Sequence, residues 1–288
     1  MVLLNGRKVS KLEIKDLKRN IKEIKIKFGI TPTLAILTNN EDIASQTYFH
    51  VKQRIADIIG VKLINIKISP FMKTKDVISK IKLLNNNMFI NGIMIQLPIY
   101  KNLDYCQIVN TINQFKDIDG CNPLNLGKLW IKHPHFVSAT SLGIIKLLKY
   151  YNIKLDGKNV VIIGRSSIVG IPLSAMFLNE NATVSITHKN TKNLKKIIDN
   201  ADILCTATGV PHLINSNLIH KDLIIVDIGM NYENGHLMGD VDFEDVSEKV
   251  KYITPVPGGV GPMTVISLMS QLIKATKEQM NNGCITRW

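Results

Sequence analysis

Three polar side chains share one face of a helix predicted over residues 44–59. Ser45, Tyr48 and Lys52 are spaced i, i+3 and i+7, which places them along a single stripe. A hydroxyl, a phenol and an amine on one stripe can bind a polar substrate, and an amine with a lowered pKa can serve as a general base. An ordinary solvent-exposed helix face would show the same pattern, so the helix alone leaves both interpretations open.

Tyr48 and Lys52 also form the YxxxK pattern of short-chain dehydrogenases. In those enzymes the glycine-rich nucleotide-binding loop precedes the YxxxK pair. In this chain the candidate loop, around Gly164, comes far later in the sequence. The order of the motifs therefore argues against this alternative.

Two further polar residues follow or interrupt apolar runs. Gln96 lies near the end of the apolar run 92–97, and a polar residue at a strand end is expected to point at a ligand. Asp119 lies in the turn Lys116-Asp117-Ile118-Asp119-Gly120. Because Asp119 precedes a glycine, turn formation alone would also explain it.

A segment rich in proline and glycine occupies residues 255–262 and contains Pro257, Gly258 and Gly259. It is too rigid and too rich in glycine for an ordinary loop. We expect it to bring backbone close to a ligand.

The segment NVVIIGRSSIVGIP, residues 159–172, predicts a strand, a tight turn and a helix. Gly164 allows the turn beside a phosphate, and Gly170 allows the helix to approach the strand. The helix amides would then face a pyrophosphate. The spacing differs from GxGxxG, so an ordinary strand-to-helix turn remains an alternative.

The charges near this turn favour NADP over NAD. Arg165 follows the turn glycine, and the next predicted strand ends at His188-Lys189 without an acidic residue to hold ribose hydroxyls. Cations there suit a 2′-phosphate, although Lys189 is equally consistent with a solvated surface lysine. Met230 follows a later strand and is expected either to contact the nicotinamide or to pack in its loop.

Alternating strands and helices must position these residues, and this pattern predicts parallel α/β sheets in two units. Strands are expected at 33–37, 61–68, 92–97, 159–163, 182–187, 203–206 and 223–228. Helices are expected at 44–59, 75–86, 104–113, 142–151, 168–178, 194–200 and 263–280, with a hairpin turn at 233–235.

Composition narrows the function classes. The chain has 288 residues, 45% of them hydrophobic, which is typical of a folded protein of one or two domains. We expect no membrane span, because no stretch approaches about 18 consecutive apolar residues, and no secretory signal, because the N-terminus turns polar after four residues. We also expect no disulfide scaffold and no metal site, because the four cysteines and seven histidines lack the required spacings. A cytoplasmic location with reduced thiols is predicted.

The net charge of +13 comes almost entirely from lysine. Coding bias spread over a solvated surface explains it, and so does attraction of a polyanionic ligand such as a nucleotide or a glutamate-tailed cofactor. Nucleic acid is not an expected partner, because no aromatic residues interleave with the charges.

Taken together, these segments resemble the bifunctional methylenetetrahydrofolate dehydrogenase/cyclohydrolase (FolD) family. The resemblance runs from about Leu34 to the last helix. It rests on Ser45/Tyr48/Lys52, Gln96–Pro98, Lys116–Gly120, Gly164–Ser166 with Val169–Pro172, and Thr254–Thr264.

The resemblance implies a catalytic, folate-binding domain at 1–139, completed by the C-terminal helix at 264–288, and a Rossmann-like NADP-binding domain at 140–263, with the active site in the cleft between them. It implies catalytic roles for Lys52, Gln96 and Asp119. Substrate binding would involve Ser45, Tyr48, Pro257, Gly258 and Gly259. Cofactor binding would involve Gly164, Arg165, Ser166, Lys189 and Met230.

The family implies two reactions on tetrahydrofolate one-carbon substrates, including polyglutamylated forms. One is the NADP-dependent oxidation of 5,10-methylenetetrahydrofolate, and the other is hydrolysis of the methenyl product to 10-formyltetrahydrofolate. It also implies a homodimer and no metal. Alternatives are a monofunctional dehydrogenase and a nucleotide-binding protein that has lost catalysis.

The chain departs from the family pattern at two helix entries. Asn40 and Ile43 replace a glycine and a proline, and residues 138–141 replace a Pro-Cys-Thr-Pro run. Loss of these prolines predicts looser entries to the two helices.

Overall fold

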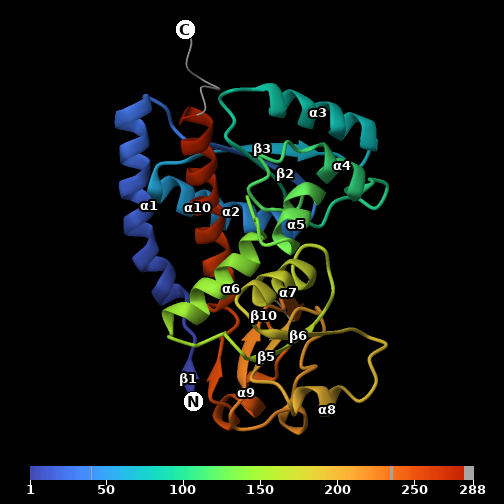
Figure 1. Cartoon of the computed structure of the whole chain (residues 1–288). Coiled ribbons are helices and arrows are strands. Elements are labelled where there is room, and N and C mark those ends of the chain that lie inside the picture. Colours follow the sequence, from blue (N-terminus) through green and yellow to red (C-terminus); the bar gives the residue numbers. More distant parts are fainter. Residues whose placement is uncertain (40, 234–235, 282–288) are drawn as a thin grey trace. The chain divides into compact units, whose positions relative to one another are not determined.

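The computed structural model describes residues 1–39, 41–233 and 236–281. The chain divides into two compact units (Figure 1). Unit 1 contains residues 1–12 and 140–266, and unit 2 contains residues 13–139 and the chain from 267 onward. Residues 1–12 were expected to belong with residues 13–139. They belong to unit 1 because β1 (Val2–Leu3) pairs in parallel with β11 (Tyr252–Ile253).

Unit 2 is built on a three-stranded parallel sheet in the order β3-β2-β4. Its strands are β2 (Thr33–Asn39), β3 (Lys62–Ile68) and β4 (Gly92–Ile95). Every residue of β2 is buried, as expected for a central strand rich in apolar and β-branched residues. The predicted parallel α/β arrangement is confirmed.

Helices from the N-terminal half of the chain and from its C-terminal end complete unit 2: α2 (Ile43–Ile59), α3 (Thr74–Asn86), α4 (Tyr105–Thr111), α5 (Pro123–Trp130) and parts of α1 (Gly6–Phe28) and α10 (Val260–Asn281). α2 packs on β2 and β3. It starts where the Asp42 carboxylate accepts the Ser45 N–H at 2.6 Å. In unit 2, α1 and α10 run side by side, with Lys277 Nζ 3.8 Å from a Glu23 carboxylate oxygen (Figure 1).

Unit 1 contains a six-stranded sheet in the order β1-β11-β8-β7-β5-β6, and all its pairs are parallel. Besides β1 and β11 its strands are β5 (Asn159–Ile163), β6 (Thr183–Thr187), β7 (Ile203–Thr206) and β8 (Ile224–Asp227). The chain passes from β5 to β6 on one side and then crosses to β7 on the other side. Such a reversal of strand order marks the ligand-binding edge of open α/β sheets.

The remaining elements of unit 1 surround this sheet: α6 (Ala139–Tyr150), α7 (Gly170–Asn179), α8 (Leu194–Ile198), α9 (Phe243–Val246), 3₁₀ helices at Ser216–Leu218 and Ser247–Lys249, and the hairpin strands β9 (Asn231–Glu233) and β10 (His236–Met238). α7 packs on β5 and β6. The antiparallel pairing of β9 with β10 confirms the predicted hairpin, whose turn at 234–235 lies outside the described residues. No helix within the described ranges has both the length and the apolar character needed to cross a bilayer.

Candidate functional site

The polar stripe of α2 faces the interior of unit 2. Ser45 is fully buried and Lys52 is 4% exposed, and Ala56 and Ile59 continue the same buried face. Tyr48 is half-buried. The alternative of a solvent-exposed face is therefore wrong for Ser45 and Lys52.

The Lys52 amine meets Gln96, which follows β4. Lys52 Nζ donates a hydrogen bond to Gln96 Oε1 at 2.6 Å. Gln96 Nε2 donates to the carbonyl of Leu97 at 3.0 Å, which fixes the orientation of the amide. The centroid of the Tyr48 ring lies 5.7 Å from Lys52 Nζ. The three predicted residues Tyr48, Lys52 and Gln96 thus come together around one amine.

Burial controls the charge of this amine. Desolvation lowers the pKa of Lys52 from 10.5 to about 8, while the nearby negative charge of Asp119 opposes the shift. Desolvation also raises the pKa of Asp119 to about 6, with a further upward contribution from Asp117. Lys52 is therefore partly neutral near physiological pH, when Asp119 is mostly ionised.

The turn that carries Asp119 is held by Asp117. The buried Asp117 carboxylate accepts the backbone N–H groups of Cys121 (3.1 Å) and Asn122 (2.8 Å) and the Nδ2 of Asn125 (2.8 Å). Asp119 Oδ1 accepts the N–H of Ala139 at 3.1 Å. The two carboxylates of this turn thus differ in use, because Asp117 builds the turn and leaves Asp119 beside the lysine.

The family prolines are replaced at the entry to α6, where the Ala139 N–H donates to the Asp119 carboxylate. Ser138 and Ala139 are 3% and 1% exposed. At the entry to α2, Asn40 and the side chain of Ile43 lie outside the described residues.

In unit 1 the predicted nucleotide turn follows β5. A Cβ atom at Gly164 would lie 2.5 Å from the Ala207 carbonyl oxygen, and one at Gly170 would lie 2.1 Å from the Gly164 carbonyl oxygen. Gly164 also has φ +117°, which L side chains rarely adopt. Both positions therefore require glycine, as predicted from the tight turn and the close helix.

The predicted cations lie at this same sheet edge. β5 and β6 end in register, since Ile163 pairs with Thr187 and the Gly164 N–H donates to the Thr187 carbonyl at 3.0 Å. Arg165, Ser166 and Lys189 follow these strand ends, and all three are exposed. Met230 follows β8 and is 47% exposed, so it is not packed away within its loop.

A residue that the sequence interpretation missed connects the neighbouring loops. The fully buried Asp240 carboxylate accepts hydrogen bonds from the hydroxyls of Thr206 and Thr208 (both 2.9 Å) and from the N–H groups of Thr208 (2.6 Å) and Gly209 (3.1 Å). It also accepts from Asn231 Nδ2 at 3.1 Å. Asp240 thus joins the loop after β7 to the loop after β8.

Asp227 extends this network to β11. Its carboxylate accepts the N–H groups of Gly229, Asp240 and Val241 at 2.9–3.0 Å. Its own N–H donates to the Thr254 hydroxyl at 2.8 Å. Desolvation raises the pKa of Asp227 to about 7. Asp240 stands in no recognisable motif, so only the folded chain identifies it.

The proline–glycine segment makes close backbone contacts within unit 1. Gly258 has φ +124°, and its carbonyl accepts the N–H of Arg7 at 3.0 Å. A Cβ atom at Gly259 would lie 2.6 Å from the Cβ of Thr254. Gly258 is therefore held against the first turn of α1 and Gly259 against Thr254, while the expected approach to a ligand stays a prediction.

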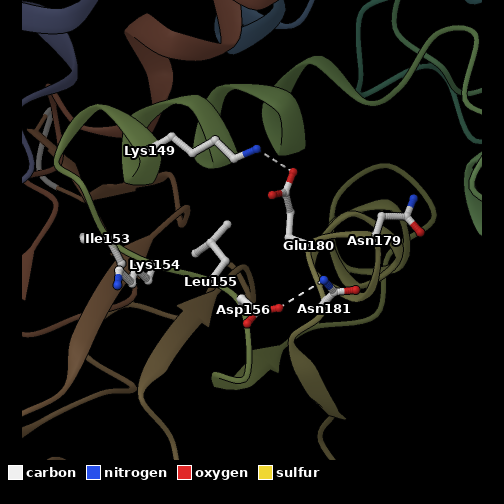
Figure 2. Close-up of a pocket in the computed structure, with 8 residues that line it drawn as sticks. All are labelled: Lys149, Ile153, Lys154, Leu155, Asp156, Asn179, Glu180 and Asn181. Atoms are coloured by element: carbon white, nitrogen blue, oxygen red, sulfur yellow. Dashed lines mark hydrogen bonds and ion pairs between the residues drawn. The ribbon is translucent and has the colours of Figure 1, made fainter.

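Unit 1 also has a surface hollow of about 390 Å³ that contains none of the predicted site residues. Two pairs of its polar groups are bonded, because Lys149 Nζ donates to Glu180 at 2.6 Å and Asn181 Nδ2 donates to Asp156 at 3.0 Å (Figure 2). It is lined by Lys149, Ile153, Lys154, Leu155, Asp156, Asn179, Glu180 and Asn181. Across the described part of the chain, no group of three or more His, Cys, Asp or Glu residues could hold a metal ion.

Two family models match this chain. The catalytic domain of tetrahydrofolate dehydrogenase/cyclohydrolase matches residues 4–119, and the NAD(P)-binding domain of the same enzymes matches residues 138–280. The chain belongs to the tetrahydrofolate dehydrogenase/cyclohydrolase family. This membership confirms the resemblance predicted from the sequence.

Relatives of this family match over nearly the whole chain. The bifunctional protein FolD of Lactobacillus helveticus is 45% identical over 96% of this chain and 98% of its own length. The crystal structure of the bifunctional enzyme FolD from Campylobacter jejuni has a TM-score of 0.93 and 39% identity, covering 97% of this chain and 99% of its own. The Trypanosoma brucei FolD, crystallised with NADP cofactor and an inhibitor, has a TM-score of 0.92 and 29% identity, covering 97% and 98%.

Proposed function

We propose that this chain is a bifunctional one-carbon enzyme. It oxidises 5,10-methylenetetrahydrofolate with NADP⁺ to the 5,10-methenyl cation and NADPH. It then adds water to the cation and releases a proton, which gives 10-formyltetrahydrofolate. The observation that carries this proposal is the buried Lys52 amine bonded to Gln96 at 2.6 Å, in a chain of this family.

The hydrolysis step uses Lys52 as the base. Water that adds to the methenyl carbon must lose a proton as the ring opens. A lysine with a pKa of about 8 supplies a neutral amine near physiological pH, whereas an ordinary lysine is almost fully protonated there. Gln96 orients the amine. Because Gln96 is neutral, it adds no charge that would shift the pKa of Lys52.

Other predicted residues have roles in binding the folate. Asp119 hydrogen-bonds the pterin end, and Tyr48 stacks against the folate body. Ser45 Oγ is buried and, among the described residues, has no hydrogen-bond partner, which supports a polar contact with substrate. We assign the backbone at Pro257, Gly258 and Gly259 to substrate contact as well.

The residues at the switch edge of unit 1 fit NADP. Gly164 and Gly170 allow the tight turn between β5 and α7, and the backbone amides after this turn suit a pyrophosphate. Exposed Arg165, Ser166 and Lys189 suit the 2′-phosphate, and the exposed Met230 suits the nicotinamide side. When bound, NADP⁺ accepts the hydride from the methylene carbon.

The decisive experiment is the variant Lys52→Met. Wild-type protein should reduce NADP⁺ in the presence of methylenetetrahydrofolate and should hydrolyse methenyltetrahydrofolate. The variant should lose hydrolysis and accumulate the methenyl intermediate. Both reactions are followed by the absorbance of the reduced nucleotide and of the methenyl product.

A matched control is Arg54→Met, which removes an exposed cation from the same helix. It should retain both reactions. Full hydrolysis by Lys52→Met would refute the role of the lysine. Tight NADP binding by wild-type protein without any turnover would instead favour a nucleotide-binding protein that has lost catalysis.

We also propose a homodimer in the cytoplasm that accepts polyglutamylated folates. β6 ends the six-stranded sheet and carries Ile186, 36% exposed, and such strand edges tend to pair. Cys106, Cys121 and Cys205 are unpaired, which supports a reducing compartment. A monomeric mass in analytical ultracentrifugation would contradict the dimer, and cell fractionation tests the location.

A further inference from the structure

One glutamine of α10 forms hydrogen bonds within unit 2 through both the nitrogen and the oxygen of its side-chain amide. Gln271 is 5% exposed. Its Nε2 donates to the carbonyls of Ile118 and Val137, both at 2.7 Å, and its Oε1 accepts the N–H of Val137 at 2.9 Å. Both hydrogens of the amide group are therefore used, and so is one lone pair of its oxygen.

These bonds join the two loops that hold Asp119. Ile118 precedes Asp119 in the chain, and Val137 lies two residues before Ala139, whose N–H donates to the Asp119 carboxylate. The loops are in close contact, since a Cβ atom at Gly120 would lie 2.4 Å from the Val137 carbonyl carbon. Gln271 thus fixes both the backbone of Asp119 and the donor that orients its carboxylate.

We propose that Gln271 is a positioning residue for the hydrolysis step. It holds the Asp119 carboxylate in place, and this carboxylate acts on the Lys52 amine. This inference rests on the proposed function, because it assigns Gln271 to the Lys52 reaction. The side chains of Ile118 and Val137 are apolar and cannot form hydrogen bonds. The bonds that join these two backbone segments therefore depend on the amide of residue 271.

The direction of the effect follows from the charges. Asp119 raises the pKa of Lys52, against the larger lowering by burial. If Asp119 loses its fixed place, this support weakens and the lysine should titrate at lower pH. The other titratable groups near the pair are Tyr48 beside Lys52, and Asp117, Cys121 and Tyr105 beside Asp119.

The test is a direct titration of Lys52 in the full chain without substrate. Lysine labelled with ¹³C at Cε is incorporated, and the Lys52 resonance is assigned by its loss in Lys52→Met. In Gln271→Met, which keeps the length of the side chain but removes every polar bond, the midpoint should fall by about 0.5–1 pH unit. Asp119→Asn should lower it at least as far, and the pH at which hydrolysis by Gln271→Met reaches half its maximum should fall by the same amount as the titration midpoint.

Gln279→Met is the matched control. Gln279 is on the same helix and also donates to two carbonyls, of Asn91 (2.9 Å) and Phe115 (3.0 Å), neither of which adjoins Asp119. It should lose thermal stability without moving the Lys52 midpoint. If Gln271→Met fails to fold, Gln271→Asn, one methylene shorter, should show a smaller shift in the same direction.

An unshifted midpoint in the folded Gln271 variant, with a loss of stability like that of Gln279→Met, would overturn the proposal, and so would an unshifted midpoint in Asp119→Asn. This outcome is distinguishable from failure of the proposed function. The titration needs no turnover, whereas the function is decided by hydrolysis in Lys52→Met.

Discussion

At the scale of single residues, the chemistry depends on how burial and charge divide the control of Lys52. Burial alone would favour the neutral amine, and an adjacent carboxylate alone would favour the ammonium ion. Here burial is the larger effect, and the result is a pKa of about 8. The hydrogen-bond partner Gln96 is neutral, so it can fix the direction of the amine without adding a charge.

This balance predicts the pH dependence of hydrolysis. The neutral amine is the base, so the rate should rise with pH, reach half its maximum near pH 8 and then level off. The unfolded chain holds this proton up to about pH 10.5, so the native state should gain stability between pH 8 and 10.5. Initial rates corrected for the uncatalysed reaction test the first point, and a flat profile from pH 6 to 9 would argue against Lys52 as the base.

Sequence spacing placed Ser45, Tyr48 and Lys52 on one face, but it could not say which way the face points. That depends on the strands β2 and β3, on which α2 packs. Gln271 and Asp240 were not found, because their partners are far along the chain and no local pattern marks them. Gln271, for example, bonds a carbonyl 153 positions away.

At the scale of elements, the ends of the unit 1 strands are tied together by buried aspartates. Asp240 accepts hydrogen bonds from the loops after β7 and β8, and Asp227 is linked through Thr254 to the end of β11. Loops at this edge are where the nucleotide is proposed to bind. The rigidity of that surface therefore depends on carboxylates that have no contact with the nucleotide in our proposal.

Asp240→Asn should separate this positioning from general folding. An asparagine side chain has one oxygen in place of two, so its NH2 group would face donors such as the N–H of Thr208. We expect a loss of about 2–4 kcal/mol in the free energy of unfolding and weaker NADP binding. Chemical denaturation and calorimetric titration with NADP measure the two effects.

The neighbouring Asp242→Asn is the control, because Asp242 caps α9 and asparagine is an equally good capping residue. It should change little. Unchanged NADP affinity in Asp240→Asn would show that the loops keep their places without this carboxylate.

Elements with a clear periodic or apolar pattern were predictable, including the four-residue β7, and elements without such a pattern were not. The strands predicted at 33–37 and 159–163 match β2 and β5 closely. Helix α1 was missed although it spans 23 residues, because its many lysines obscure a narrow buried stripe at Val9, Leu17, Ile21 and Ile24. The two-residue strands β1 and β11 are too short to carry any pattern, and β1 decides where the first residues belong.

At the scale of the whole molecule, sequence composition left two explanations open for the net charge of +13. If it reflects only coding bias, it should not affect one substrate form more than another. If it attracts polyanions, folates with longer glutamate tails should benefit most, because each added residue contributes a negative charge.

The proposed preference for polyglutamylated folates should therefore depend on salt. The ratio of kcat/KM for triglutamyl to monoglutamyl methylenetetrahydrofolate should fall several-fold between about 20 mM and about 300 mM potassium chloride, since the screening length shortens over this range. Comparing the two substrates on the same enzyme cancels any general effect of salt on the fold or on NADP binding. A ratio above one that does not change with salt would assign the preference to short-range contacts with the tail, and a ratio of one throughout would leave the positive charge with no role in choosing the substrate.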